Sequence, residues 1–445
     1  MIIRSISGVR GTAPEFTSES ISRYAQAFNA LQPKGVFMLG RDTRPSGERF
    51  IEDVAQALIS VGRDVINLNI VPTPTVQFMV ENTDAVGGIV VTASHNPTEW
   101  NGLKFIREDG TFLLSDECRQ LFKSVDIDGE FSDVDQEPGL HFPDVNAIQK
   151  HVIKVASLSF IQQNEIRKRN FKVVVDAVNG AAFEALPYML ESLGCEVIKI
   201  HCNGDGNFAR PPEPLPENLT DLSAAVVQNK ADVGFASDPD GDRLAVILED
   251  GRPAGDEYTL VIAADGYLQT VNKPEVIVTN LSTTLALEKL AEQYGSTVKR
   301  SAVGEINVVQ KMIESGSNLG GEGNGGVILK EAHLGRDSLV AATMILHRMA
   351  MTDKPIGTIY DNLPQFSIVK DRVELDGIDK EAVFNKARSI FSDANINEVD
   401  GVKFTWTDRW IHLRLSNTEP IMRIYAEGPT KADAQELVNQ IRFSL

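Results

Sequence analysis

A strand–helix–strand pattern that occurs three times constrains the fold of this chain most strongly. The first copy joins an apolar run at residues 35–40 to an extended run at 64–68 through a helical pattern that ends at Gly62. The other copies begin at residues 172–176 and 275–279. Short links between strand, helix and strand are typical of parallel βαβ units. The pattern predicts an α/β fold, with convergence on a common supersecondary unit as the alternative to a true repeat.

Each copy is followed by a short strand that runs into a polar loop. The three loops are Thr92-Ala93-Ser94-His95-Asn96-Pro97, Asp238-Pro239-Asp240-Gly241-Asp242-Arg243 and Gly321-Glu322-Gly323-Asn324-Gly325-Gly326. Open α/β sheets keep their ligand sites just beyond the carboxyl ends of the strands. We therefore expect three loops in equivalent places to build one shared cleft.

The length of the chain predicts several domains, because 445 residues exceed what one hydrophobic core serves. After Pro364 the pattern changes, and residues 404–415 and 421–427 alternate like strands of a smaller α+β domain. The fold class is thus α/β, with three similar mixed α/β domains plus the smaller C-terminal domain. The predicted boundaries are 1–148, 149–250, 251–364 and 365–445.

The net charge of -19 argues against nucleic acid or an anionic membrane as a partner. An anionic ligand would then need a local cluster of arginines and backbone donors. The cysteines Cys118, Cys195 and Cys202 lack metal-ligand spacing, which fits a reducing compartment. The N-terminal residues lack the apolar core of a signal peptide, and no stretch approaches the roughly 20 apolar residues of a membrane helix. These features predict a cytoplasmic protein.

The first loop places Ser94 just past a strand, and we interpret this serine as a phosphate carrier. A serine hydroxyl is a poor nucleophile unless a base or a metal assists it. His95 and Lys104 are nearby candidates for handling the proton. Taken alone, these residues favour an ordinary turn with a solvated serine; the other loops change the balance.

The second loop is predicted to bind a metal ion. Asp238, Asp240 and Asp242 alternate, so in extended structure their carboxylates share one side. Mg²⁺ suits oxygen ligands of this kind. A calcium loop would require glycine at its sixth position, where this chain has Arg243, so we reject that interpretation. A solvated acidic turn is the remaining alternative.

The third loop is predicted to contact a sugar. It matches the dinucleotide pattern G-x-G-x-x-G, but the acidic residue expected about 20 positions later is missing. Glu322 and Asn324 are instead suited to hydrogen-bonding hydroxyl groups, with His333 and Arg336 as further donors. A plain tight turn is the alternative.

A fourth loop, in the C-terminal domain, is predicted to bind a phosphate dianion. It combines guanidinium groups, hydroxyls and amides. These residues are Arg414, Ser416, Asn417, Thr418 and Arg423. A surface hairpin with incidental arginines is the alternative. Two glycine-bounded loops nearer the start, at residues 8–11 and 40–44, also contain arginines, and we rank them lower because these side chains can equally be solvated.

The four loops, in this order, resemble the α-D-phosphohexomutase superfamily over essentially the whole chain. The resemblance implies four domains around a central cleft and a phosphoserine at Ser94. It implies Mg²⁺ held by that phosphoserine and by the three aspartates, Asp238, Asp240 and Asp242. It makes Glu322 and Asn324 the residues that contact the sugar, and it makes the fourth loop the site for the phosphate that is not reacting. Positive charge near the phosphoserine falls on Arg10, Lys104 and Arg243, and Lys104 resembles the family's general acid/base.

The reaction implied by the resemblance moves phosphate between C1 and C6 of a hexose. Phospho-Ser94 donates to a sugar monophosphate, and the resulting hexose 1,6-bisphosphate turns around and returns its other phosphate. The expected partner is thus a small-molecule sugar phosphate, and the expected assembly is a monomer or a homodimer.

The sugar preference depends on individual positions of these loops. The family often has serine at Asn324, histidine at Gly326 and glycine at Pro239. The third loop and residues 333–337 look more like phosphoglucosamine mutases than like animal-type phosphoglucomutases, which favours glucosamine phosphate. Phosphoglucomutase or phosphomannomutase specificity is the alternative. Two other classes are a sugar-phosphate hydrolase and a non-catalytic sugar-phosphate-binding protein.

Overall fold

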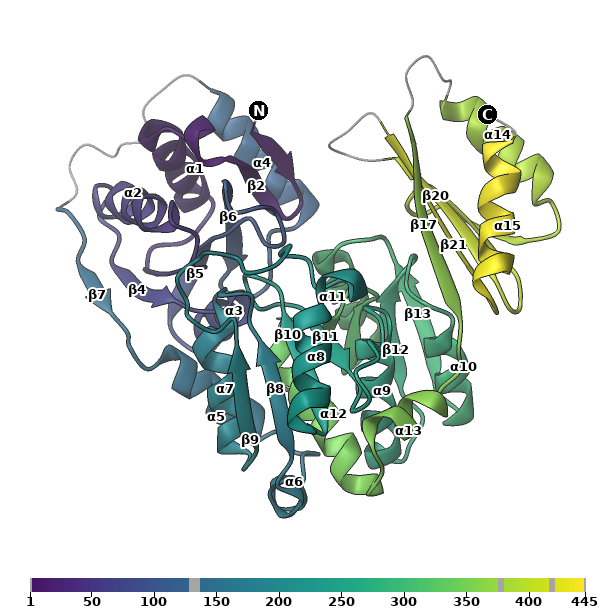
Figure 1. Ribbon diagram of the computed structural model, residues 1–445. Helices are drawn as coiled ribbons and strands as arrows, with labels where there is room; N and C mark the ends of the chain where they lie inside the picture. The colour runs from purple at the N-terminus through teal and green to yellow at the C-terminus, as the bar shows by residue number, and fades with distance from the viewer. Residues whose placement is uncertain (1, 128–136, 375–379, 416–420, 444–445) are drawn as a thin grey trace.

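The computed structural model of the protein describes residues 2–127, 137–374, 380–415 and 421–443. Within these residues the strands form four sheets, which the chain builds one after another (Figure 1). The sheets use residues 3–143, 172–247, 276–336 and 367–428, and we call these parts of the chain, with their helices, the first to fourth units. Three mixed α/β units followed by a smaller α+β unit confirm the predicted fold class.

The first unit has the largest sheet. Its strands are β1 (Ile3–Ser5), β2 (Gly8–Thr12), β3 (Val36–Arg41), β4 (Val65–Ile70), β5 (Ala85–Val91), β6 (Trp100–Arg107) and β7 (His141–Pro143). Its helices are α1 (Ser18–Ala30), α2 (Gly47–Ile59), α3 (Thr73–Glu81) and α4 (Ser115–Asp126), with a 3₁₀ turn at Ala13–Glu15. The strand order is β1-β2-β6-β5-β3-β4-β7, and β3 runs parallel to both β4 and β5.

Alternating side chains cover both faces of this first sheet. Phe37 and Leu39 of β3 pack with residues of α1, α2 and α4, whereas Met38 between them packs with residues of α3 on the other face. All residues of β5 are buried, as expected for a strand covered on both faces. The apolar runs of the sequence therefore became central strands.

The second and third units repeat a smaller version of this arrangement. The second contains β8 (Lys172–Asp176), β9 (Glu196–Ile200), β10 (Val233–Ser237) and β11 (Leu244–Ile247), with α5 (Ala147–Ala156), α6 (Gln163–Arg169), α7 (Ala182–Ser192), α8 (Thr220–Asn229) and a 3₁₀ turn at Pro216–Asn218. The third contains β12 (Val276–Asn280), β13 (Thr297–Ser301), β14 (Leu319–Glu322), β15 (Gly326–Leu329) and β16 (His333–Arg336), with α9 (Tyr258–Val271), α10 (Ala286–Gln293), α11 (Glu305–Ser315), α12 (Ser338–Thr352) and α13 (Ile356–Asp361). Their strand orders are β11-β10-β8-β9 and β13-β12-β14-β15-β16.

The three predicted loops occupy equivalent places in these three sheets. In each case a strand of the parallel part runs into the loop, and the next strand returns antiparallel to it: β5 to β6, β10 to β11 and β14 to β15. The loops therefore all follow the carboxyl ends of strands, which is where α/β sheets place their ligand sites.

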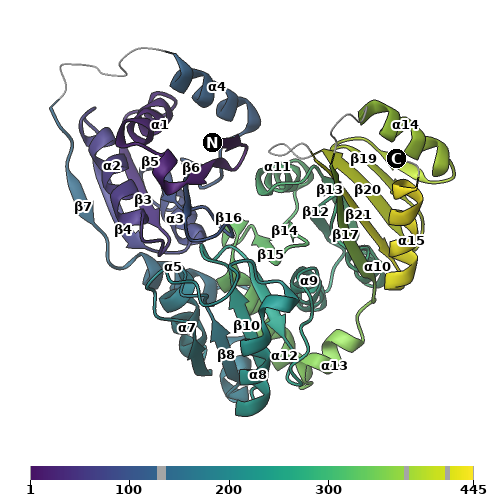
Figure 2. The ribbon, with the colours of Figure 1, turned by 45° about the horizontal axis from the view of Figure 1, so that its top comes forward.

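The fourth unit is an antiparallel sheet with helices on one face. It contains β17 (Ser367–Glu374), β18 (Asn395–Asn397), β19 (Val402–Thr405), β20 (Trp410–Leu415) and β21 (Ile421–Gly428), in the order β17-β21-β20-β19-β18, with α14 (Lys380–Ile390) and α15 (Lys431–Arg442). The helices lie on the side of the sheet away from the first unit (Figures 1 and 2). The other face of the sheet is thus turned toward the rest of the molecule.

The hydrophobic cores join the first three units and leave the fourth with its own. One apolar cluster runs continuously from Val152 in the second unit to Leu363 at the end of the third. A second cluster joins α3 of the first unit to α11 of the third. The fourth unit packs around a separate cluster that includes Phe404 and Leu437. Among the described helices, none is long and apolar enough to cross a membrane.

Candidate active site

A cleft of about 490 Å³ is lined by residues from all four units. The first unit contributes Ser94, His95, Arg10 and Lys104, and the second contributes Arg243. The third and fourth contribute the remaining predicted residues that line the cleft: Glu322, Asn324, Arg336, Arg414 and Arg423. The structure therefore brings together residues from all four predicted loops, which are separated by more than 300 positions in the chain.

Ser94 is a buried residue of the cleft lining and has an unusual backbone conformation. Its φ of 50° is left-handed, which costs a residue other than glycine roughly 1 kcal/mol or more. The Ser94 amide donates to Thr92 Oγ1 (2.9 Å), and the Ser94 hydroxyl donates to Asp238 Oδ2 (3.3 Å). His95 Nδ1 lies 3.3 Å from the same hydroxyl. The strained backbone thus directs the hydroxyl at both the acidic loop and an imidazole.

Arg44 fixes this loop from behind, a role that the sequence analysis missed. Its buried guanidinium donates to the carbonyl oxygens of Ser94 (2.6 Å), Asn96 (2.7 Å) and Trp100 (3.0 Å), and also to that of Pro97. Asp42 pairs with Arg44 Nε at 2.9 Å. Both residues follow β3, which lies parallel to β5 in the sheet. Ligand sites gather beyond adjacent parallel strands, and this rule could have identified Asp42 and Arg44 from the sequence.

The three aspartates of the second loop converge as a group that can hold a metal ion. One carboxylate oxygen from each of Asp238, Asp240 and Asp242 lies within 4.8 Å of the others, and all three side chains are buried. Asp240 Oδ1 and Asp242 Oδ1 are buried without a hydrogen-bond donor in the described part of the chain. Burial and the charges of Asp242 and Asp240 raise the pKa of Asp238 well above its usual range. Carboxylates that repel one another, two of them with an oxygen that accepts no hydrogen bond, are suitable ligands for a hard divalent cation.

Lys104 lies against this acidic group as a resident cation. Its Nζ is 2.6 Å from Asp240 Oδ2 and 3.2 Å from Asp242 Oδ2. Burial opposes the charge on Lys104, but Asp240 and Asp242 hold the pKa of the ammonium above its usual value. Lys104 is therefore protonated at neutral pH.

His95 has the opposite protonation state. Burial and the nearby charges of Arg243 and Arg10 hold the pKa of its imidazole well below the usual value. Arg243 Nη2 donates to His95 Nδ1 at 3.1 Å, so Nδ1 carries the lone pair. The site thus contains His95 as a neutral proton acceptor and Lys104 as a charged proton donor.

Arg10, Arg243 and Arg423 add positive charge to the lining of the cleft. Burial, together with the charges of Arg243 and Arg423, lowers the pKa of Arg10. Arg10 donates to Asn96 Oδ1 at 3.1 Å, and Arg243 pairs with Glu213 at 3.1 Å. Guanidinium groups that repel one another in a partly buried cleft favour an anion between them.

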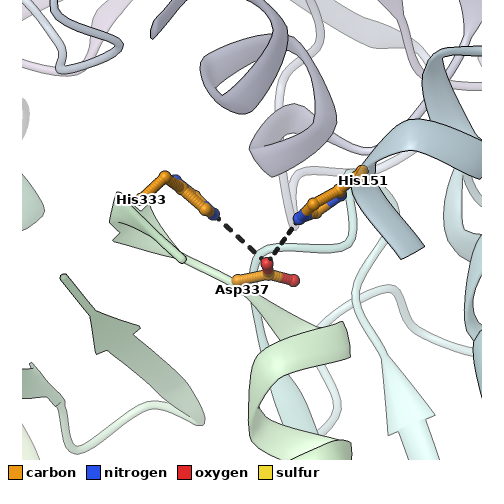
Figure 3. Close-up of side chains that lie close together, drawn as sticks. All are labelled: His151, His333 and Asp337. Carbon is orange, nitrogen blue, oxygen red and sulfur yellow. Dashed lines mark hydrogen bonds and ion pairs between the residues drawn. The ribbon is translucent and has the colours of Figure 1, made fainter. Parts of the chain in front are cut away.

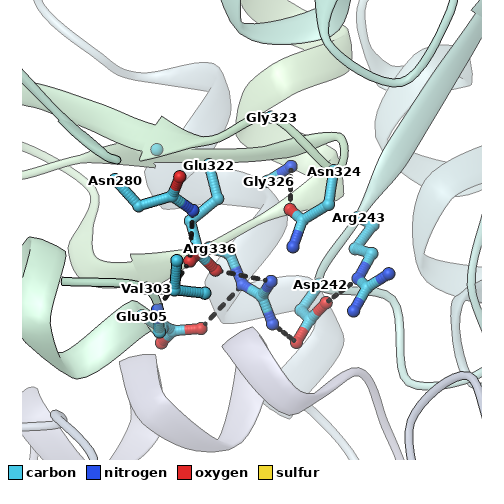
Figure 4. Close-up of polar contacts among 12 residues, drawn as sticks. Asp242, Arg243, Asn280, Val303, Glu305, Glu322, Gly323, Asn324, Gly326 and Arg336 are labelled. Carbon is cyan, nitrogen blue, oxygen red and sulfur yellow. Dashed lines mark hydrogen bonds and ion pairs between the residues drawn. The ribbon is translucent and has the colours of Figure 1, made fainter. Parts of the chain in front are cut away.

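Arg336 joins Asp242 of the second predicted loop to Glu322 of the third, the predicted sugar loop (Figure 4). Its buried guanidinium lies 2.7 Å from Asp242 Oδ2, 2.9 Å from Glu305 Oε2 and 3.0 Å from Glu322 Oε2. Arg336 also lines the cleft, so its role as a substrate donor stays a prediction. Its guanidinium lies between three carboxylates and so positions both loops; Glu305, one of the three, was not predicted from the sequence.

Glu322 is held from two further directions. Asn280 Nδ2 donates to Glu322 Oε1 at 2.8 Å, and the Gly304 amide donates to the same oxygen at 2.9 Å. Asn324 Oδ1 accepts from the Gly326 amide at 3.3 Å. Both side chains line the cleft in fixed positions.

His333 does not reach the cleft, in contrast to the sequence-based expectation. It lies in a buried cluster where His333 Nε2 and His151 Nε2 are 3.2 Å and 2.9 Å from the same Asp337 oxygen (Figure 3). In β16, residues three apart point to opposite faces of the sheet, so His333 and Arg336 diverge. We therefore leave His333 out of the substrate contacts. The cluster joins α5 to the start of α12.

The predicted phosphate loop is described only at its two ends. Arg414 of β20 and Arg423 of β21 are directly paired across the antiparallel ladder, and both line the cleft. Asp400 lies 2.9 Å from Arg414 Nε and also accepts from the Val303 amide of the third unit. Ser416, Asn417 and Thr418 lie outside the described residues.

Four family domains match successive parts of this chain, one for each structural unit. Residues 2–129, 149–251 and 254–366 match the phosphoglucomutase/phosphomannomutase alpha/beta/alpha domains I, II and III, respectively. Residues 370–443 match the C-terminal domain of the same family.

Relatives and solved structures cover nearly the whole chain. A phosphoglucomutase/phosphomannomutase of Thermococcus kodakarensis is 35% identical and matches over 96% of this chain and 95% of its own length. A probable phosphoglucosamine mutase of Methanopyrus kandleri is 32% identical, with 97% and 95% covered. The crystal structure of a phosphoglucomutase/phosphomannomutase family protein from Burkholderia thailandensis superimposes with a TM-score of 0.86 at 26% identity, covering 100% of this chain and 98% of that one. The chain therefore belongs to the phosphoglucomutase/phosphomannomutase family, which confirms the resemblance to α-D-phosphohexomutases.

Proposed function

We propose that this protein is a phosphohexomutase that interconverts hexose 6-phosphate and hexose 1-phosphate through a phosphoserine at Ser94, with glucosamine phosphate as the preferred substrate. The observation that carries the proposal is the position of the Ser94 hydroxyl. It lies 3.3 Å from Asp238 of the acidic triad, and Arg10, Arg243 and Arg423 line the same cleft. A phosphoryl group on that hydroxyl would meet positive charge on the cleft side.

The three aspartates and phospho-Ser94 would hold Mg²⁺. The unpartnered oxygens of Asp240 and Asp242 fit such an ion. When bound, the ion would neutralise charge on the phosphoryl oxygens. Arg10 and Arg243 would neutralise the same group from the cleft side, because a phosphoryl transition state needs positioning and charge neutralisation more than covalent help.

His95 and Lys104 would divide the proton transfers. In the first transfer, the phosphoryl group leaves Ser94 Oγ for a sugar hydroxyl oxygen, so the P–O bond to Ser94 breaks and the P–O bond to the sugar forms. The sugar hydroxyl loses a proton and Ser94 Oγ gains one, so the transfer needs one acceptor and one donor. The neutral His95, once Arg243 releases its Nδ1 lone pair, and the charged Lys104 would supply them. The return transfer reverses these steps.

The other phosphate of the sugar would bind the fourth unit. One reactive serine must meet both ends of the substrate, so a hexose 1,6-bisphosphate intermediate turns around between the two transfers. Arg414 and Arg423, with Ser416, Asn417 and Thr418, would hold the phosphate that is not reacting. A trace of the bisphosphate would also serve as the activator that phosphorylates Ser94.

The sugar preference is supported by the third loop and by the names of two relatives. Glu322 and Asn324 are in place to accept and donate hydrogen bonds to sugar hydroxyls. Glucosamine phosphate is favoured by the form of the loop and by the name of the Methanopyrus kandleri relative. The name of the Thermococcus kodakarensis relative favours glucose and mannose phosphates as the second candidates.

A phosphorus NMR experiment tests this function directly. The protein is mixed with Mg²⁺ and a trace of hexose 1,6-bisphosphate, and glucosamine, glucose and mannose 6-phosphates are supplied in separate samples. We expect a sugar 1-phosphate signal to grow, fastest with glucosamine. Inorganic phosphate as the sole product would support a hydrolase, and unchanged spectra with phosphorylated Ser94 would support a binding protein.

Substitution of Arg414 by alanine is expected to raise KM at least about tenfold and to change kcat much less. A clamp on the distant phosphate holds the ground state and the transition state alike, so its loss weakens binding uniformly. Steady-state kinetics with hexose 6-phosphate measure both constants. Arg409→Ala, which removes an exposed arginine from the same unit, is the matched control. An unchanged KM would contradict the assigned role.

Mg²⁺ is expected to raise the melting temperature of the wild-type protein but not that of the Asp238→Asn variant. A ligand that binds the folded state alone stabilises it by about RT ln(1 + [L]/Kd). Thermal unfolding with increasing Mg²⁺ measures the shift without any need for turnover. Asp250→Asn, in an exposed turn after β11, should shift like the wild type. Equal shifts in all three proteins would place the ion elsewhere.

A further inference from the structure

Glu257, which the sequence analysis did not single out, lies beside the sugar loop. It directly precedes α9, is 7% exposed and lines the cleft. Its carboxylate occupies the space next to Gly323, so a Cβ at that glycine would collide with it. Gly323 is the residue between Glu322 and Asn324, the two side chains expected to contact the sugar. The Glu257 carboxylate therefore lies in the cleft beside the loop that is expected to contact a hexose.

The carboxylates that line the cleft differ in how they are paired. Glu213 lies 3.1 Å from Arg243, Asp256 lies 2.7 Å from Lys370, and Glu305 and Glu322 lie 2.9 Å and 3.0 Å from Arg336. For Glu257, the nearest ion pair in the described part of the chain is with Lys370 at 3.7 Å. Lys370 is thus shared, and its shorter contact goes to Asp256. Glu257 is the cleft-lining acid with the weakest cationic partner.

The surroundings of Glu257 favour a further cation. Burial raises the pKa of Glu257 well above its usual range; Lys370 opposes this shift, whereas Asp256 and Glu427 add to it. Its Oε2 accepts from the Thr284 amide at 3.1 Å, which fixes one side of the carboxylate. A buried charge is costly unless it is paired, so a cationic group in the cleft would stabilise the ionised form.

We propose that Glu257 determines specificity by binding the protonated amino group of a hexosamine phosphate. This inference rests on the proposed function, in which the cleft holds a hexose phosphate. An ammonium group would form a charge-assisted hydrogen bond to the carboxylate, which is stronger than the bond from a neutral hydroxyl. Glucose phosphate, with a hydroxyl at the same carbon, would leave the charge of Glu257 without its partner.

The test compares two sugars on the same variants. We expect Glu257→Gln to lower the ratio of kcat/KM for glucosamine 6-phosphate to that for glucose 6-phosphate by at least about tenfold, because the neutral amide keeps the shape and removes the charge. Glu314→Gln, which removes an exposed carboxylate of α11 outside the cleft lining, is the matched control and should leave that ratio within about twofold. An equal loss for both sugars in Glu257→Gln, or an equal shift of the ratio in Glu314→Gln, would overturn the proposal.

If a variant fails to fold, the affinity of the wild-type protein for three sugar phosphates, measured by calorimetry, tests the proposal instead. We expect glucosamine 6-phosphate to bind more tightly than both glucose 6-phosphate and N-acetylglucosamine 6-phosphate, in which acetylation removes the charge. Equal or weaker binding of the charged sugar would overturn the role of Glu257. Absence of turnover with this binding preference intact would instead contradict the mutase activity, so the two failures are distinguishable.

Discussion

Replacement of Ser94 by alanine is expected to lower hexose phosphate isomerisation by at least about a thousandfold, because the variant lacks the oxygen that carries the phosphoryl group. The neighbouring residues would stay in place. Arg44 holds the loop through its carbonyl oxygens, which the substitution does not alter. Alanine also tolerates the left-handed backbone about as poorly as serine does, so strain changes little.

The folded state of the Ser94→Ala variant should remain close to that of the wild type. The lost hydroxyl makes contacts of 3.3 Å with Asp238 and His95, and its removal should cost about 1 kcal/mol of unfolding free energy or less. Thermal unfolding and coupled-assay kinetics measure the two effects. Thr98→Ala, on the same loop and outside the cleft lining, is the control that should retain turnover. Turnover near the wild-type rate in Ser94→Ala would contradict a phosphoserine mechanism.

Replacement of Arg336 by methionine is expected to have the second largest effect, on stability and on turnover together. It would leave the carboxylates of Asp242, Glu305 and Glu322 buried without the guanidinium that lies within 3.0 Å of each. Removal of one partner from a buried charge network typically costs about 3–5 kcal/mol. Because Asp242 and Glu322 would both lose their positions, kcat should fall at least about tenfold.

Two further variants separate the causes of that loss. Arg336→Lys keeps the charge but cannot reach three carboxylates at once, so it should be intermediate. Glu305→Gln added to Arg336→Met removes one unpaired charge and should recover at least about 1 kcal/mol of unfolding free energy. Denaturant unfolding measures these differences. A melting temperature for Arg336→Met equal to that of the wild type would show that the guanidinium does not hold the two loops together.

The sequence predicted the architecture well because its strongest signals are local. The apolar run at residues 85–91 and the βαβ patterns each specify an element without long-range information. The polar loops follow these strands directly, so the rule about carboxyl ends of strands predicted that the first and second loops lie together, and the Ser94 hydroxyl is 3.3 Å from Asp238 Oδ2.

The sequence did not predict the contacts that depend on how distant strands pair. Arg44 reaches the Ser94 loop because β3 and β5 are adjacent, although 50 residues separate the two side chains. Arg336 follows the sugar loop in the sequence, but its ion pair with Glu322 depends on how β14, β15 and β16 pair. His333 was grouped with Arg336, although alternation along a strand predicts opposite faces for residues three apart.

The sequence also does not predict that Glu257 lies beside the sugar loop. It precedes α9 by one position and lies 66 residues before Gly323, so no motif links them. Its closeness to the sugar loop appears only once α9 packs beside β14 and β15 in the third unit. Its weak cationic pairing appears only after the partners of every other cleft-lining carboxylate are known.

A phosphoryl chase from Ser94 to a sugar tests the central claim most directly. The protein is phosphorylated with labelled hexose 1,6-bisphosphate, separated from free ligand, and then mixed with unlabelled glucosamine 6-phosphate. Peptide mass spectrometry before and after mixing locates the label. We predict that the label starts on Ser94 and moves to the sugar bisphosphate within a turnover. Label that stays on Ser94, lies on another residue or appears as inorganic phosphate would contradict the account.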